Sequence, residues 1–136
     1  MDRTSILLVQ NSFARVYAHK AELTDRFYAN LFEALPEAER LFKQDFFYQK
    51  EMFTTMLAST VRSLASVDTF RELGERLARQ HAGVGVAPEQ YGTAAKALIN
   101  AMRDVLDGEI SEEEERAWRL AIESLTGRMT EGAEQG

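Results

Sequence analysis

The chain has 136 residues, 45% of them apolar and 28% charged, and a net charge of −6, which predicts one folded domain and excludes a disordered chain. It has no cysteine and two histidines, so disulfides, thiolate chemistry and a multi-histidine metal site are excluded. The negative charge disfavours nucleic acid and membrane partners, and no apolar run is long enough for a spanning helix or a secretory signal. By elimination we expect a cytoplasmic protein.

Residues 1–136 are expected to form a single all-α domain of seven or eight helices, with a frayed tail over about 130–136. Two prolines and eight glycines are too few to punctuate a many-stranded fold. Apolar residues instead recur at helical spacing. The expected helices, in chain order, cover about 3–18, 21–34, 36–41, 47–65, 68–81, 88–107 and 111–130.

Local signals define several helix ends. Pro36 and Pro88 each suit a first helical position. Asp68 is expected to cap the helix that follows it, and Ser111 with Glu114 forms a capping box before the last helix. The glycine-containing segment 81–86 is expected to form a loop.

His81 stands at the end of an apolar stripe, four residues after Leu77. It is either a partly buried histidine satisfied by a carbonyl group or a neutral imidazole at the mouth of an apolar pocket, which is what haem iron needs as an axial ligand. Tyr91 is a candidate for the polar neighbour that fixes the tautomer of such a ligand.

Four further residues are candidates for a pocket. Tyr28 lies on an otherwise apolar helix face, where its phenol is either solvated or directed at a ligand. Gln49 and Phe53 share one face of the long helix. Gln49 is either a solvated surface amide or a hydrogen-bond donor in the pocket, and Phe53 is either a core ring or a wall of the pocket. Phe42 is either ordinary core or a ring that wedges a planar cofactor.

In order and spacing, these residues resemble the bacterial globins of the flavohaemoglobin and single-domain haemoglobin lineage, over roughly residues 5–130. The matching positions are the run 27–32, Pro36, Phe42, Gln49, His81, the run 88–91 and Trp118.

The resemblance implies a globin fold around one haem b, since a c-type linkage needs cysteine. His81 corresponds to the proximal iron ligand, and Tyr91 to the tyrosine that hydrogen-bonds it. Phe42 matches the corner phenylalanine that packs on haem. Tyr28 and Gln49 match the distal donors to bound dioxygen. Nitric oxide and carbon monoxide are the other implied ligands.

Two positions depart from the lineage. Leucine is common where Phe53 stands, so the pocket is either tighter or the helix register shifts by one and Tyr48 faces the pocket in place of Gln49. A glutamate that pairs with the proximal tyrosine is also expected near the end of the last helix. Glu131 and Glu134 are the candidates for it.

Several uses of such a site compete. One is oxygen binding or transport, and another is nitric oxide dioxygenase activity with a separate reductase, because the chain ends about where a fused reductase would begin. The alternatives are a haem-based gas sensor, although no output domain is expected, and a haem-free interaction domain. We expect a monomer or a homodimer.

Overall fold

The structure is a computed structural model that describes residues 1–42, 46–83 and 85–135, with the side chains at 41, 42, 46, 134 and 135 outside the described part. The described residues form helices and no strand, which confirms the all-α prediction. The elements are α1 (Arg3–Ala18), α2 (Lys20–Ala34), the 3₁₀ segment η1 (Pro36–Phe42), α3 (Phe46–Ser63), α4 (Val67–Gly83), the 3₁₀ segment η2 (Pro88–Gln90), α5 (Tyr91–Val105) and α6 (Glu112–Gln135).

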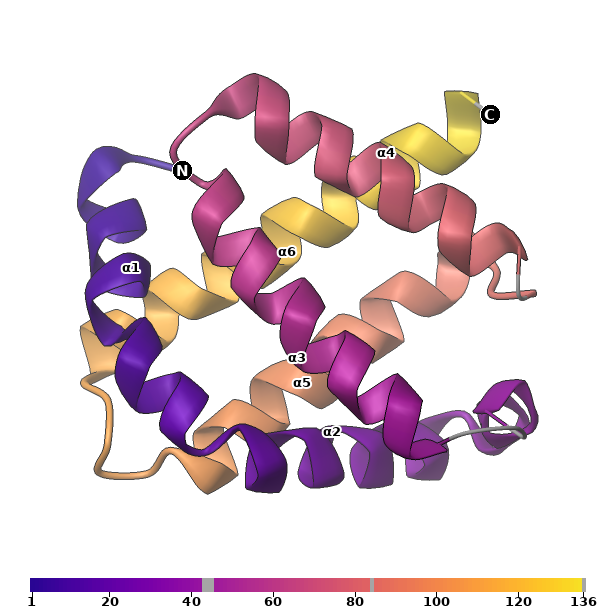
Figure 1. Cartoon of the computed structure of the whole chain (residues 1–136), viewed down its shortest axis with the longest axis horizontal. Helices are drawn as coiled ribbons and strands as arrows, with labels where there is room; N and C mark the ends of the chain where they lie inside the picture. Colours follow the sequence, from indigo (N-terminus) through magenta and orange to yellow (C-terminus); the bar gives the residue numbers. More distant parts are fainter. Residues whose placement is uncertain (43–45, 84, 136) are drawn as a thin grey trace.

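The helices cross one another in two layers (Figure 1). The main packing pairs are α4 with α6, α2 with α5, and both α1 and α5 with α6. Helix α3 runs diagonally across the front of α5 and touches α1, α2 and α4 at its sides. The C-terminal half of α4 and the N-terminal half of α3 therefore lie on the same side of the molecule, on the right in Figure 1.

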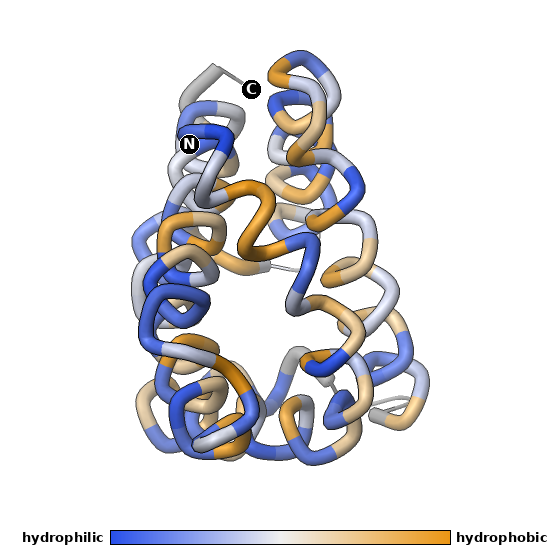
Figure 2. The backbone as a smooth tube through the Cα atoms, turned by 90° about the vertical axis from the view of Figure 1, so that its left-hand side faces the viewer, coloured by the Kyte–Doolittle hydropathy of each residue, from blue (hydrophilic) through white to orange (hydrophobic). Residues whose placement is uncertain are grey.

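The core forms because each helix is apolar on one face only. Figure 2 shows hydrophobic and hydrophilic segments alternating turn by turn along the helices. At the centre of the α1–α6 contact, Trp118 is 2% exposed, and its indole Nε1 donates to Ser12 Oγ at 2.8 Å. Ser12 in turn donates to the carbonyl of Leu8 at 2.7 Å, so this buried indole N–H and hydroxyl are both satisfied.

The helix ends match the sequence prediction at some places and differ at others. The capping box is confirmed, since Ser111 N donates to Glu114 Oε1 at 2.9 Å and Glu114 N donates to Ser111 Oγ at 3.1 Å. The predicted cap at Asp68 is wrong, because Thr69 N donates to Ser66 Oγ at 3.3 Å and Asp68 lies inside the first turn.

Two helices are longer than the sequence predicts. Helix α4 continues to Gly83, so His81 lies in a helix and not in a loop. The glycine closes this helix instead of breaking it earlier, as glycine commonly does at a C-terminus. Helix α6 continues to Gln135, past Thr130, where the frayed tail is expected to begin.

Two polar contacts link α2 to its neighbouring helices. Lys50 Nζ of α3 lies 2.6 Å from Asp25 Oδ1 of α2. Asn30 Nδ2 of α2 donates to the carbonyl of Ala97 in α5 at 3.2 Å. These links hold α2, α3 and α5 in register with one another. Within the described ranges, no helix is long and apolar enough to cross a membrane.

Candidate functional site

Tyr28 is buried on the inner face of α2, with only 6% of its surface exposed. Its ring lies 4.9 Å from that of Phe27, 5.8 Å from that of Phe32 and 5.9 Å from that of Phe53, measured between centroids. Burial raises the pKa of the Tyr28 phenol to about 12, because the phenolate is poorly solvated among aromatic rings. The side chain, which is neutral at pH 7 even without this shift, remains a hydroxyl donor well into the alkaline range.

Helix α3 supplies the wall beside Tyr28. The Phe53 ring is buried and stacks on that of Phe27 at 4.6 Å, so this position faces α2 as predicted for a pocket wall or a core ring. Gln49, one turn earlier, is half-buried, whereas Tyr48 is 56% exposed. Gln49 is therefore the less exposed of the two alternative residues.

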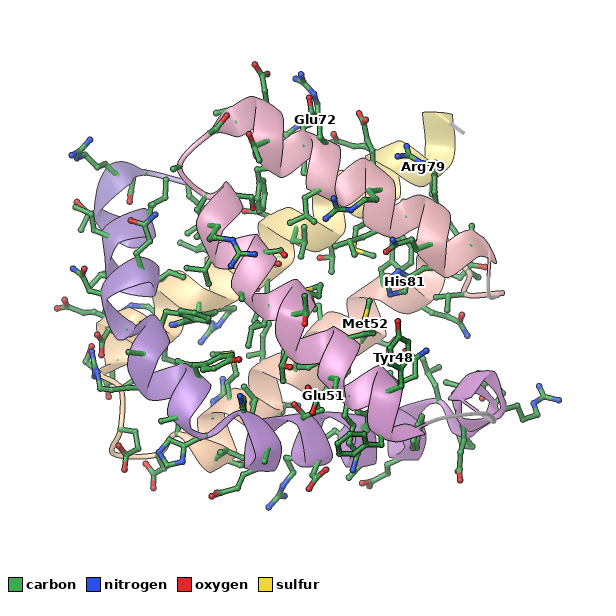
Figure 3. All side chains as sticks on the ribbon, in the orientation of Figure 1. Tyr48, Glu51, Met52, Glu72, Arg79 and His81 are labelled. Carbon is green, nitrogen blue, oxygen red and sulfur yellow. The ribbon has the colours of Figure 1, made fainter. Side chains whose placement is uncertain are left out.

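Tyr48 nevertheless lies on the side of α3 that faces His81 of α4, the other part of the candidate site. Figure 3 shows Tyr48 and Met52 of α3 directed toward the region of His81, while Glu72 and Arg79 of α4 point away from it. Tyr48 and Met52 therefore stand at the edge of the space between α3 and α4. The side chain of Phe42 lies outside the described residues, although its backbone closes η1.

His81 projects from the last turn of α4 and is half-buried. Its Nδ1 lies 2.6 Å from the carbonyl oxygen of Leu77, one turn earlier in the same helix. A carbonyl oxygen only accepts, so Nδ1 donates its proton, and in the neutral imidazole Nε2 then keeps its lone pair. The histidine thus has the carbonyl partner of the ordinary structural interpretation, and it also leaves free the nitrogen that a metal requires.

Tyr91, the first residue of α5, lies beside His81. The two rings are 6.1 Å apart and meet edge to face. Tyr91 is 3% exposed, and its hydroxyl makes no hydrogen bond to any described residue. Burial raises the pKa of this phenol. The expected hydrogen bond from Tyr91 to the histidine is absent among these residues, because the carbonyl of Leu77 holds the Nδ1 proton.

The expected glutamate partner of Tyr91 is also not found among the described side chains. Glu131 is exposed and accepts a hydrogen bond from Arg128 Nη1 at 3.3 Å. The side chain of Glu134 lies outside the described part of the chain. Sequence reasoning proposed these two residues from their place near the chain end, which does not specify the direction of a side chain.

The donor set fits haem better than a bare metal ion. The described residues contain no group of three or more acidic or histidine side chains that could hold a metal. One imidazole nitrogen cannot retain a free ion, but haem brings its own four ring nitrogens and needs only an axial protein ligand. His81 offers that nitrogen, and the aromatic side chains of α2 and α3 offer an apolar surface for a planar group.

Comparison with known proteins agrees with this arrangement. The sequence matches the family described as Globin over residues 25–129. It is 24% identical to a flavohemoprotein of Bacillus subtilis over 124 residues, covering 89% of this chain and 31% of that protein. The chain thus spans about a third of the length of this curated relative.

Two solved structures share the fold. A bacterial globin from Campylobacter jejuni superposes with a TM-score of 0.84 at 18% identity, covering 98% of this chain and 97% of that one. A hexacoordinated heme protein from an anhydrobiotic tardigrade superposes with a TM-score of 0.86 at 20% identity, covering 98% and 96%. With the helix order, the shared fold and the family match all in agreement, this chain belongs to the globin family.

Proposed function

We propose that this globin binds one haem b between α3 and α4, with His81 as the axial ligand, and that it binds dioxygen beside Tyr28 and Gln49. The observation that carries the proposal is the 2.6 Å contact between His81 Nδ1 and the carbonyl of Leu77, which leaves Nε2 available. The haem would be of the b type, because the chain has no cysteine for a covalent linkage.

Different residues of the chain have different roles at this site. Bound haem supplies an iron with one open position for a diatomic ligand. Leu77 fixes the tautomer and the ring orientation of His81 through its carbonyl. Tyr28 and Phe53, which are both buried, exclude water from the opposite side.

Tyr28 is the residue that favours dioxygen over carbon monoxide at this site. Its phenol is neutral at physiological pH, as an ordinary tyrosine is, and burial raises its pKa further to about 12, so it donates a hydrogen bond. Hydrogen bonds in a dry pocket are stronger than in water. A donor stabilises a ligand that gathers negative charge, as dioxygen does, more than a nearly neutral one such as carbon monoxide. Gln49, half-buried on α3, would add a second donor.

A second use of the same site is the conversion of nitric oxide and dioxygen to nitrate. The similarity to a flavohemoprotein favours it. This reaction consumes one electron per turnover, so it needs a reductase partner. Stopped-flow mixing of the dioxygen complex with nitric oxide, with and without a reductase, measures this activity, and catalytic turnover only with the reductase is the expected result.

The absorption spectrum of protein produced with a haem supply tests the primary proposal. The parent protein should show a haem band, and His81→Ala should lose most of its haem on purification. His19→Ala is the matched control, because His19 lies at the α1–α2 junction near Glu22 and Glu109 and away from the pocket. Full haem content and an unchanged ferrous spectrum in His81→Ala would refute the assignment.

A further inference from the structure

Helix α4, which carries His81, crosses α6 at two glycines. At Gly74 of α4, an added Cβ would lie 2.5 Å from the Cβ of Arg128 in α6 and 3.2 Å from its carbonyl carbon. At Gly132 of α6, an added Cβ would lie 3.1 Å from the Cα of Glu75 in α4. These distances lie inside ordinary van der Waals contact. The two backbones therefore approach this closely because both positions lack a side chain.

This crossing lies directly before the proposed iron ligand. Gly74 precedes His81 by about two helical turns, so both residues lie on the same side of α4. Between them, the Cβ of Ala78 would be 3.5 Å from a Cβ at Gly132. Leu77, whose carbonyl holds the His81 ring, belongs to the same stretch. Any change in the separation of the two helices here is passed to His81 by a rigid helix.

Side-chain packing, and not polar contacts, holds the described part of α4 in position against the other helices. The hydrogen bonds and the ion pair of the described α4 side chains are local, namely Arg71 to Asp68 and His81 to Leu77, and at the start of the helix the backbone N–H of Thr69 donates to Ser66 Oγ. No polar contact ties a described α4 side chain to another helix, in contrast to the Asp25–Lys50 ion pair between α2 and α3. The close crossing on α6 is therefore the contact that most directly sets the position of α4.

We propose that Gly74 and Gly132 are positioning residues that set how deeply His81 Nε2 reaches into the pocket, and thereby the strength of the iron–histidine bond. This inference rests on the proposed function, since it assumes that His81 is the axial ligand. A methyl group at Gly74 meets a Cβ that is fixed to the α6 backbone and cannot turn away. It can be accommodated only if α4 moves away from α6.

The test compares haem-loaded variants by two measurements. The first is the iron–histidine stretching band of the unliganded ferrous protein in resonance Raman spectra. The second is the rate at which haem transfers to an excess of a haem-scavenging apoprotein. We expect Gly74→Ala to shift the band and to release haem about tenfold faster, a change equivalent to roughly 1.4 kcal/mol. Gly132→Ala, where the contact is less severe, should change both measurements in the same way but less.

Two matched controls come from the same helices. A Cβ at Gly127 of α6 or at Gly83 of α4 would meet nothing within 4 Å, so Gly127→Ala and Gly83→Ala should leave the band unshifted. Val16→Ala removes buried apolar volume from α1, away from the crossing. It should lower the melting temperature without moving the band, which separates positioning from general destabilisation.

A compensating pair makes the test sharper. In Gly74→Ala/Arg128→Gly, the 2.5 Å contact with the Cβ of Arg128 is removed and only the milder 3.2 Å contact with its carbonyl carbon remains, so most of the crossing distance should be restored. The band should move back toward the parent value even though a helical glycine at 128 lowers stability. If Gly74→Ala does not fold, Gly132→Ala and its Gly127→Ala control still decide the question.

The outcomes also separate this inference from the proposed function. A parent protein with no iron–histidine band would refute His81 as the ligand. A parent band that is lost in His81→Ala but unshifted in Gly74→Ala or, where that variant does not fold, in Gly132→Ala would overturn only the positioning role. A band that is shifted as far in the compensated pair as in Gly74→Ala alone would likewise overturn it, because removal of the 2.5 Å contact would then have no effect on the iron–histidine bond.

Discussion

Replacing Tyr28 with phenylalanine tests the proposed dioxygen site most directly. The ring contacts with Phe27, Phe32 and Phe53, at centroid distances of 4.9, 5.8 and 5.9 Å, do not depend on the hydroxyl. Tyr28→Phe keeps these contacts and removes only the phenol oxygen. The change therefore keeps the ring contacts of the fold and tests what the hydroxyl contributes to binding of the ligand.

The size of the effect follows from the burial of Tyr28. A neutral hydrogen bond contributes about 0.5–1.5 kcal/mol, and one with a charged partner about 1.5–3 kcal/mol. Dioxygen bound at iron gathers partial negative charge, so it lies between these cases. A loss of about 1–3 kcal/mol is equivalent to a change of roughly five- to 150-fold in affinity. Most of it should appear as faster dissociation, because the hydrogen bond forms after the ligand has entered.

Stopped-flow measurement of dioxygen and carbon monoxide dissociation provides the assay. Dioxygen should leave Tyr28→Phe much faster than the parent protein, while carbon monoxide dissociation changes little. Tyr17→Phe is the control, because Tyr17 is an exposed tyrosine on α1 whose ring lies 5.5 Å from that of Phe13, away from the proposed haem site. A dioxygen rate within about twofold of the parent would show that Tyr28 is not the donor, and Gln49 or Tyr48 would then become the candidate.

Three further predictions concern the same chain. The unliganded ferrous form should be five-coordinate, because the distal side offers Gln49 and Tyr28 and no histidine; a low-spin ferrous spectrum without added ligand would contradict this. Gln49→Leu should speed dioxygen dissociation in the same assay, but less than Tyr28→Phe does. Glu114→Gln should retain the capping box with Ser111 and lose the ion pair with Arg15, whose hydrogen bonds hold the pKa of Glu114 below its usual 4.5. A lowered carboxyl pKa stabilises the fold above about pH 4.5 and loses this contribution as the pH falls, so denaturant titrations should show the variant less stable at pH 7 and the difference shrinking in acid.

The sequence predicts the fold well because the signals for helices are local. Apolar spacing, the capping box of Ser111 and Glu114, and the sparse prolines are all visible within a few residues. The errors occur where a local signal has two meanings. Gly83 suggests a break after His81, yet a glycine also suits the last turn of a helix, and α4 uses it there. Asp68 resembles a cap, but Ser66 occupies the capping position.

The candidate site is visible in the sequence only in part, because its geometry depends on contacts between distant segments. The sequence proposes Tyr28 and Phe53 separately, and the structure places their rings 5.9 Å apart. It proposes Tyr91 as the partner of His81, whereas the Nδ1 proton is held by the carbonyl of Leu77. A backbone carbonyl is present at every residue, so no residue type marks this partner in advance.

Glycine shows most clearly what the sequence leaves out. Within a helix, a glycine is read as a cost of about 1 kcal/mol relative to alanine, and by that measure Gly74, Gly127 and Gly132 are equivalent. The structure separates them, because a Cβ would collide with the opposite helix at Gly74 and Gly132 and would meet nothing at Gly127. This difference between the glycines is visible only in the packing of α4 on α6.

The two sides of the site are held in place by different kinds of contact. On the distal side, α2, which carries Tyr28, packs on α5 and also has polar links, to α3 through Lys50 and Asp25 and to α5 through Asn30. On the proximal side, the described side chains of α4 have no such link to another helix, and the close crossing at Gly74 positions His81 by shape. A polar link favours one relative position of two helices, whereas the separation of two closely packed helices changes when a single methyl group is added between them. Changes on α2 should therefore act on the ligand's hydrogen bond, and changes at the α4–α6 crossing should act on the bond between iron and histidine.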